Sequence, residues 1–307
     1  MTTQIKPTAA LARLAAAVDS YPEGRDATVL AAAIAQATGA ELMLLAIEPD
    51  LPLIIPGLQR DQVRQETEAM LKHTRTSLAP GARLKITSDL SIPRGLERLT
   101  RAQHRDLLVV GSSRRGPTGA VSIGGRTRQL IDDVGCALAI APRGLCRQHP
   151  FALTRIGVGF DGGPEAQAAL AMAAQIAAGA GADLIVRGVT DDRVPALGWP
   201  SVWMGEIMET WKEMMAEEER DLRSGIEEAV AAGAMAARID MTRGSPAASL
   251  HALSKKVDLL VIGSRRWGPI ARLVLGGTGE RLVHGAECSV LIAPRPRSPA
   301  VAERPDS

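Results

Sequence analysis

The sequence predicts an α/β protein of two repeated open-sheet domains, each with a five-stranded parallel sheet that carries helices on both faces. Two observations lead to this fold class. Segments of the chain recur at nearly constant offsets, and within each copy short apolar runs alternate with stretches of helical periodicity. The length of 307 residues also fits two domains of about 150 residues each.

The repeat is defined by matching segments in the two halves. Asp106–Gly111 (DLLVVG) returns as Asp258–Gly263 (DLLVIG), at an offset of 152 residues. Upstream, Gly39–Leu42 returns as Gly181–Leu184, at an offset of 142 residues. The offset is already 152 where Gly81 returns as Gly233, so the second copy carries about ten additional residues between Ile47/Val189 and Gly81/Gly233. Three of the four tryptophans lie in that longer interval, which we interpret as a packed cap, a lid near the second site or a partner-docking surface: Trp199, Trp203 and Trp211.

The first half of copy two alternates strand and helix. Ile156–Phe160 is a short apolar run, as expected of a strand that is buried on both faces. Glu165–Ala178 is rich in alanine with apolar residues at helical spacing, and Gly179–Gly181 ends this helix. Leu184–Val189 is a second apolar strand, and Glu206–Ala232 has the apolar and charged faces of a long amphipathic helix.

The second half of copy two continues the alternation. Arg238–Thr242 is expected to form the third strand, and Pro246–Lys255 a helix, because a proline in the first turn loses no hydrogen bond. Leu259–Ile262 is a continuous apolar strand, Gly279–Gly285 lies in a helix, and Val290–Ala293 is the fifth strand. Copy one follows the same order, and strands that alternate with helices form parallel sheets.

The repeat also sets the domain organisation. We expect domain 1 at residues 1–145, a linker at 146–154 and domain 2 at 155–296. Residues 297–307 are polar and rich in proline, which predicts a disordered tail.

The last strand of each copy presents an apolar edge. Ala137–Ala141 and Val290–Ala293 both end a sheet, and an uncovered apolar edge invites aggregation. Two copies in one chain can cover these edges mutually, so we expect the fifth strands to pair with each other.

Composition excludes several functional classes. Aromatic residues make up only 2% of the chain and the net charge is +2, so neither base stacking nor polyanion binding is expected. The chain holds three cysteines and no Cys-x-x-Cys pair, which favours a reducing cytoplasm. No run of about 18 apolar residues occurs, so we expect no membrane partner.

Glycines mark a candidate ligand site in each copy. Gly111 and Gly263 end the fourth strands, where a missing side chain lets a ligand approach the backbone. Gly124-Gly125 and Gly276-Gly277 open the next helices, whose free N–H groups and positive dipole ends suit a phosphate.

Acidic residues lie beside the same point. Asp19 and Asp161 follow the first strands, and ligands of open α/β sheets bind beyond the carboxyl ends of the strands. A carboxylate at this position can accept hydrogen bonds from a ribose or a base amine.

At these residues the sequence resembles the universal stress protein family. The resemblance rests on Gly159–Glu165 (GFDGGPE), Asp258–Arg265 (DLLVIGSR) and Cys288–Pro294 (CSVLIAP), and it covers both copies. It implies a sheet of order 3-2-1-4-5 and homodimers that pair through strand five. It also implies that some members bind ATP through a Gly-x2-Gly-x9-Gly-Ser/Thr loop, whereas members without that loop do not.

In this chain the loop departs from that pattern. The second glycine is replaced by Arg114 and Arg266, which either neutralise phosphates or fill the space that glycine would leave. The Ser/Thr position holds Gly125 and Gly277, and a hydroxyl follows one residue later only in copy two, at Thr278. Copy two is therefore the better candidate for a nucleotide.

The sequence thus predicts a tandem, cytoplasmic stress-response module that binds ATP or another adenine nucleotide, mainly in domain 2. The alternative is an interaction scaffold of the same fold that binds no nucleotide. No catalytic residues and no metal-ligand cluster are expected, so any ATP hydrolysis should be slow and incidental. The candidate nucleotide-binding residues are Gly159, Asp161, Val189, Ile262, Gly263, Arg266, Gly276, Gly277 and Thr278 in domain 2, and Asp19, Gly111, Gly124 and Gly125 in domain 1.

Overall fold

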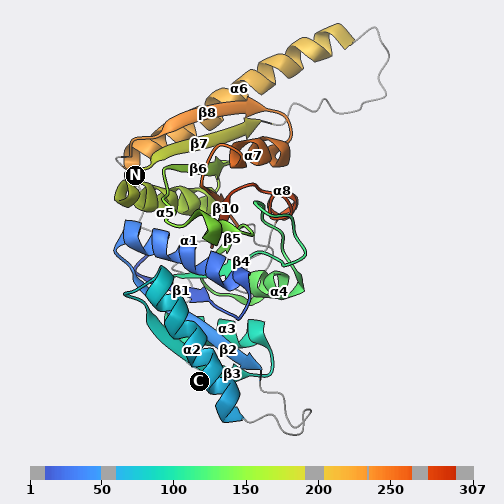
Figure 1. Ribbon diagram of the computed structural model, residues 1–307. Helices are drawn as coiled ribbons and strands as arrows, with labels where there is room; N and C mark the ends of the chain where they lie inside the picture. The colour runs from blue at the N-terminus through green and yellow to red at the C-terminus, as the bar shows by residue number, and fades with distance from the viewer. Residues whose placement is uncertain (1–10, 50–59, 191–203, 234, 265–275, 295–307) are drawn as a thin grey trace, which may run out of the picture.

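The computed structural model describes residues 11–49, 60–190, 204–233, 235–264 and 276–294. A single ten-stranded sheet runs through both halves in the order β3-β2-β1-β4-β5-β10-β9-β6-β7-β8 (Figure 1). Of the three clustered tryptophans, Trp199 and Trp203 lie outside the described residues, as does the expected tail at 297–307.

The described residues of the first half form five strands and four α-helices, followed by a short 3-10 helix. These are β1 Arg13–Ala17, α1 Pro22–Thr38, β2 Glu41–Pro49, α2 Arg60–Leu78, β3 Arg83–Asp89, α3 Ile92–Ala102, β4 Leu107–Gly111, α4 Gly125–Asp133, β5 Ala137–Ala141 and η1 Leu145–Gln148.

The second half repeats this order, and each expected element is present with ends that differ by a few residues. The elements are β6 Arg155–Phe160, α5 Pro164–Ala180, β7 Asp183–Thr190, α6 Met204–Ala232, β8 Arg238–Arg243, α7 Pro246–Ser254, β9 Leu259–Gly263, α8 Gly277–Leu282 and β10 Ser289–Ala293. The expected helix Gly279–Gly285 begins two residues earlier and ends at Leu282.

Local sequence sets the ends of the two central helices. Pro22 and Pro164 open α1 and α5, where the missing N–H has no partner to lose. Gly39 and Gly181 end them with φ of 68° and 64°, a left-handed conformation that residues with a Cβ rarely adopt. The same proline-to-glycine pattern therefore produces the same helix in both copies.

Each half has the strand order 3-2-1-4-5 with parallel pairing throughout. The two halves join because β5 and β10 pair antiparallel, with Ala139 opposite Leu291. The expected pairing of the fifth strands is confirmed. The expectation of two five-stranded parallel sheets requires correction, since mutual covering of the apolar edges makes one mixed sheet of ten strands.

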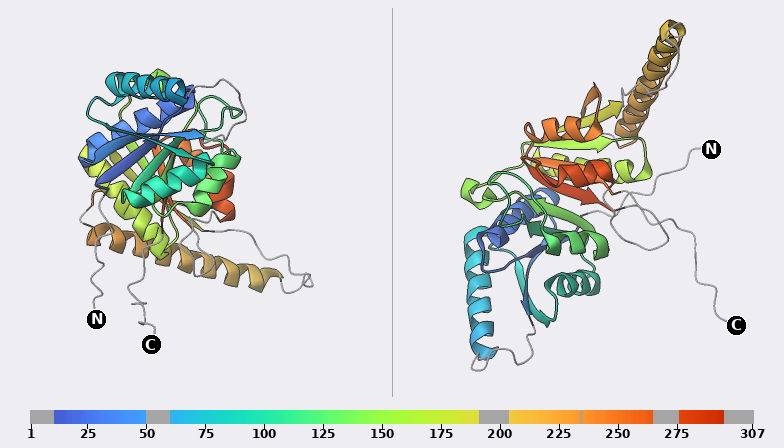
Figure 2. Two further views of the ribbon diagram at one scale, coloured as in Figure 1. Left: turned by 90° about the horizontal axis from the view of Figure 1, so that it is seen from below. Right: turned by 90° about the vertical axis from the view of Figure 1, so that its right-hand side faces the viewer.

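Helices cover both faces of this sheet (Figures 1 and 2). On one face α1, α2, α5 and α6 bury residues such as Leu30, Leu71 and Ile176. On the other face α3, α4, α7 and α8 bury residues such as Leu99 and Leu253. Burial of each such leucine or isoleucine side chain contributes about 1.5–3 kcal/mol. The α6 helix extends beyond the sheet edge in all views, and Trp211 lies on it, half-buried.

The segment after β5 is anchored to domain 1. The buried carboxylate of Asp26 on α1 accepts hydrogen bonds from the N–H groups of Gly144 and Cys146, at 2.8 and 2.7 Å.

No helix among the described residues combines the length and apolar character that crossing a membrane requires.

Candidate functional site

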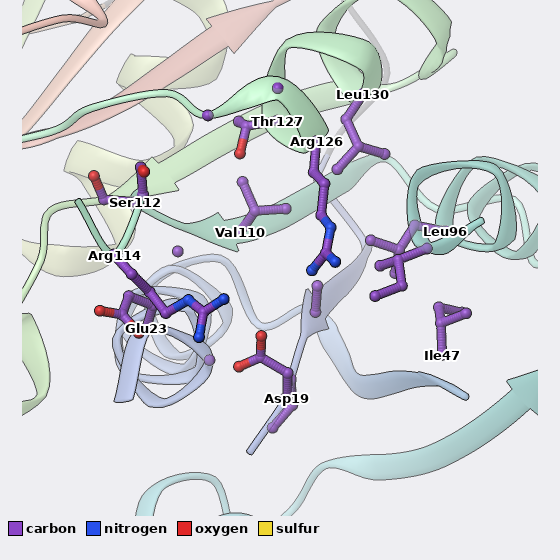
Figure 3. A pocket seen from close by; sticks show the side chains of 18 of the residues that line it. Asp19, Glu23, Ile47, Leu96, Val110, Ser112, Arg114, Arg126, Thr127 and Leu130 are labelled. Atoms are coloured by element: carbon purple, nitrogen blue, oxygen red, sulfur yellow. The ribbon is translucent and has the colours of Figure 1, made fainter. Parts of the chain in front are cut away.

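A pocket of about 430 Å³ opens at the carboxyl ends of the domain 1 strands (Figure 3). This volume lies within the range of small-molecule sites. The pocket is bounded by β1, β2 and β4, by the first turn of α1, and by α3 and α4. It therefore occupies the crevice in which open α/β sheets bind ligands.

One side of the pocket is apolar. In Figure 3, Ile47 and Leu96 lie on this side with Leu130 above them, and Val110 lies toward the middle. The apolar lining residues are Ala17, Val18, Leu45, Ile47, Ile92, Leu96, Val110 and Leu130. A slot of aliphatic side chains suits a flat, weakly polar ring system.

The opposite side carries Asp19. Its Oδ1 accepts a hydrogen bond from the N–H of Tyr21 at 3.1 Å. Burial raises the pKa of the Asp19 carboxyl, and the neighbouring Glu23 acts in the same direction, whereas the Tyr21 hydrogen bond and the charges of Arg114 and Arg126 oppose the shift. Asp19 is exposed to solvent, so a polar ligand in the pocket can reach its carboxylate.

Two arginines turn toward this carboxylate (Figure 3). Arg114 follows β4, and its guanidinium carbon lies 3.7 Å from the centroid of the Tyr21 ring, a cation–π contact. Arg126 is the second residue of α4 and reaches into the pocket from the helix N-terminus. The pocket therefore combines positive charge with the positive end of a helix dipole.

A serine shapes the loop between β4 and α4. The Ser112 hydroxyl accepts the N–H of Ser122 at 2.7 Å and donates to the Ser122 carbonyl at 3.0 Å. The N–H of Ser113 donates to the same carbonyl at 2.7 Å. The loop is also tied to domain 2, because the N–H of Val121 donates to the carbonyl of Ala286 at 2.8 Å. Ser112 thus fixes the wall from which Arg114 projects.

The predicted glycines fall into two groups. A Cβ on Gly111 would overlap the carbonyl oxygen of Glu23, and one on Gly263 would lie 2.7 Å from the carbonyl carbon of Glu165. These two positions require glycine because a helix start packs against the strand end. At Gly125, by contrast, a Cβ would have no other atom within 4 Å, so the N-terminus of α4 is open.

Glu23 is a candidate site residue that the sequence reasoning missed. Its side chain lines the pocket and is buried, and its Oε1 lies 3.4 Å from Nε of Arg143. Its Oε2 has no hydrogen-bond partner among the described residues. The signal that could have found it is the repeat itself, since Glu23 returns as Glu165 at the offset of 142 residues.

In domain 2 the structure describes part of the corresponding site. Asp161 follows β6, Gly159 and Val189 lie in β6 and β7, and Ile262 and Gly263 end β9. The remaining predicted residues are Gly276, Gly277 and Thr278 at the start of the six-residue α8, and Arg266, which lies outside the described residues. Within the described part of the chain, no group of three His, Cys, Asp or Glu side chains is placed to hold a metal ion.

Comparisons with known proteins agree with this fold. The family model described as "Universal stress protein family" matches residues 12–142 and again residues 153–294. Universal stress protein Rv2005c of Mycobacterium tuberculosis is 24% identical over 244 residues, which cover 76% of this chain and 78% of that protein.

Solved structures give the same result for the fold. A universal stress protein from Archaeoglobus fulgidus superposes with a TM-score of 0.64 at 16% identity, covering 92% of this chain and 96% of that one. A functionally unknown protein from Pseudomonas aeruginosa PAO1 superposes with a TM-score of 0.63 at 16% identity, covering 93% and 94%. These likenesses extend over both halves of the chain.

Proposed function

The chain belongs to the universal stress protein family, as two matches along its length show, and from this premise we propose that it is a regulatory protein whose domain 1 binds an adenine nucleotide. The observation that carries the proposal is the domain 1 pocket. It has an aliphatic slot on one side, and Asp19, Arg114 and Arg126 on the other.

The chemistry of the pocket matches the three parts of a nucleotide. The aliphatic side chains accept the base. The carboxylate of Asp19 accepts hydrogen bonds from ribose hydroxyls. The open N-terminus of α4 presents main-chain N–H groups to phosphates, and the guanidinium groups of Arg114 and Arg126 neutralise their charge. In this proposal the arginines take the place of the glycine and hydroxyl that the family's ATP loop carries.

Domain 2 remains a second candidate. The sequence favours it because of Thr278 and Asp161, but the loop that includes Arg266 lies outside the described residues. The described part of domain 2 supports the proposal less well than domain 1 does, since α8 has six residues and α4 has nine. We therefore place the main site in domain 1.

The competing function is an interaction scaffold that binds no nucleotide. Arg114 favours it, because the side chain stacks on Tyr21 and lies where the family's loop has a glycine. In either case we propose a cytoplasmic binding protein rather than an enzyme. A homodimer would need a surface other than strand five, since β5 and β10 already pair within the chain.

The test is calorimetric titration of the full chain with ATP, ADP and AMP. We expect saturable binding that weakens at least tenfold in Arg126→Gln. Arg128→Gln is the matched control, because Arg128 lies on the same helix but pairs with Glu280 outside the pocket, and its affinity should equal that of the wild type. No saturable binding of any of the three nucleotides would contradict the proposal and support the scaffold.

A further inference from the structure

The walls of the two sites differ at an equivalent position in the second strand of each half. In domain 1, Leu45 of β2 lies opposite Ala17 of β1 and Lys85 of β3, and it lines the pocket. In domain 2 the equivalent strand β7 places Arg187 opposite Gly159 and Asp240. The sheet register therefore puts Arg187 of domain 2 where domain 1 has Leu45.

Arg187 is buried and held by a polar network. Its Nη2 lies 2.5 Å from Oδ2 of Asp240, and the Arg187 side chain is 7% exposed. Its Nη1 donates to the hydroxyl of Ser249 at 3.0 Å and to the Ser249 carbonyl at 3.3 Å. The Ser249 hydroxyl is in turn 2.6 Å from that of Thr242. The Nε of Arg187 is buried with no partner among the described residues.

This network lies on the site face of the sheet. Ser249 belongs to α7, which buries Leu250 and Leu253 on the same face on which α3 lines the domain 1 pocket. Leu250 of α7 also packs beside the first strand of this half. A Cβ on Gly159 would lie 3.1 Å from the methyl carbons of Leu250, so Leu250 occupies the room next to the strand.

The consequence concerns the base. In domain 1 a purine ring would contact aliphatic side chains, and removing their apolar surface from water has a favourable free energy. In domain 2 the same ring would contact the buried guanidinium of Arg187 and the partly exposed carboxylate of Asp240. Making room for the ring would separate this pair and leave the buried guanidinium of Arg187 without its counter-charge.

We infer that Arg187, held by Asp240 and Ser249, excludes the base of an adenine nucleotide from domain 2, so that each chain binds one nucleotide, in domain 1. This inference rests on the proposed function. It makes Arg187 a residue that distinguishes the two sites, in addition to Arg126 of domain 1, whose counterpart in domain 2 is Thr278.

The experiment measures stoichiometry by native mass spectrometry and calorimetry of the full chain with ATP. We expect one ATP per wild-type chain, and its loss in Arg126→Gln. Two ATP per chain would overturn the inference and leave the proposed function intact, whereas no ATP would contradict the proposed function itself. Retention of the single site in Arg126→Gln together with its loss in Asp161→Ala would also overturn the inference.

Exchange of the distinguishing pair tests the cause. Arg187→Leu with Asp240→Lys gives domain 2 the pair of domain 1, and we expect a second ATP. A folded variant that still binds one ATP overturns the role of Arg187. The reverse exchange, Leu45→Arg with Lys85→Asp, should weaken binding more than tenfold, with Lys85→Asp alone as the control because Lys85 is exposed. If the domain 2 double variant does not fold, the Leu45→Arg, Lys85→Asp variant still tests the role of the arginine. Unchanged ATP affinity in that variant overturns the inference.

Discussion

Gly179 of α5 lies directly against the main chain of Ala37 of α1, so close that a Cβ on Gly179 would overlap the Ala37 carbonyl oxygen. The two helices belong to different halves of the chain and lie side by side over the middle of the sheet (Figure 1). We predict that Gly179→Ala lowers the free energy of unfolding by about 3 kcal/mol, because the backbone cannot yield as a side chain would. Urea denaturation followed by circular dichroism measures the change.

Gly225 provides the matched control for this prediction. It lies within α6, and a Cβ placed on it would meet no side chain or other segment within 4 Å beyond its chain neighbours and the backbone of its own helix. Gly225→Ala should therefore leave stability unchanged or raise it by about 0.5–1 kcal/mol, through the better helix propensity of alanine. Equal effects of the two substitutions would show that the contact between α1 and α5 is not tight in solution.

The aspartate of the repeated DLLV block has a structural role that can be tested at Asp258. Its Oδ2 accepts the N–H groups of Thr154 and Arg155, at 2.8 and 2.9 Å, and the Thr154 hydroxyl at 2.7 Å. Asp106 makes the corresponding bonds to the start of β1. We predict that Asp258→Ala lowers the free energy of unfolding by about 1–3 kcal/mol, since it removes charge-assisted hydrogen bonds at the strand start.

The control for Asp258 is Asp183→Ala. Asp183 is exposed at the first position of β7, and changes at exposed positions usually alter stability by less than about 0.5 kcal/mol. Both variants are compared by thermal and chemical unfolding. If Asp258→Ala lowers the free energy of unfolding no more than Asp183→Ala does, the repeated hydrogen bonds at the strand start do not contribute to stability.

The repeat made most of the fold predictable. Matching blocks such as Asp106–Gly111 and Asp258–Gly263 fix where the fourth strands lie, and strand alternation then gives a parallel sheet. The pairing of the fifth strands followed from their apolar edges. Helix ends were less predictable: α8 starts at Gly277, within the glycine pair, rather than at Gly279.

The candidate site was predictable only in part. Asp19 and Gly125 were found because strand ends and helix starts meet at one edge of a parallel sheet. The close packing of Glu23 against Gly111 gave a helix-packing reason for a glycine that the sequence attributed to a ligand. Arg187 was missed because its importance depends on strand register and on Ser249, which comes from a distant helix.

Reactivity of Cys146 offers a prediction that depends on pH. Burial raises the pKa of its thiol to about 11, and the hydrogen bond and negative charge of Asp26 act in the same direction. The thiolate is the reactive form, so alkylation of the native chain by iodoacetamide should accelerate up to about pH 11. At pH 8 it should be at least tenfold slower than in the chain unfolded by urea. Peptide mapping by mass spectrometry gives both rates, and a native rate that levels off near pH 8.5 would contradict the shift.

The ion pair between Arg128 and Glu280 should contribute little to stability. It joins α4 to α8 with Nη2 and Oε1 2.5 Å apart, but the two side chains are 54% and 46% exposed. Exposed pairs are screened by water and salt, so they contribute little to stability. We predict that Arg128→Gln changes the melting temperature by less than about 3 °C, and that any difference disappears in 0.5 M NaCl. A larger loss that persists at high salt would show that the pair holds the two domains together.

Asp19 connects stability and function through its ionisation. Burial raises the pKa of this carboxyl above its ordinary value in the unfolded chain, so the protonated form favours folding. Its stabilising contribution is full below the unfolded pKa of about 3.9 and is lost as the pH rises through the folded pKa. In Asp19→Asn this loss is absent, so the melting temperature of the variant relative to wild type should rise between pH 4 and pH 7.

The same variant should bind ATP more weakly at pH 7, because the amide offers no negative charge to ribose hydroxyls and can still accept the N–H of Tyr21. Greater stability with weaker binding is the behaviour expected of a binding site rather than of a structural carboxylate. The opposite outcome is a melting temperature that differs from wild type by the same amount at every pH, together with unchanged ATP affinity. It would show that Asp19 only stabilises the turn before α1.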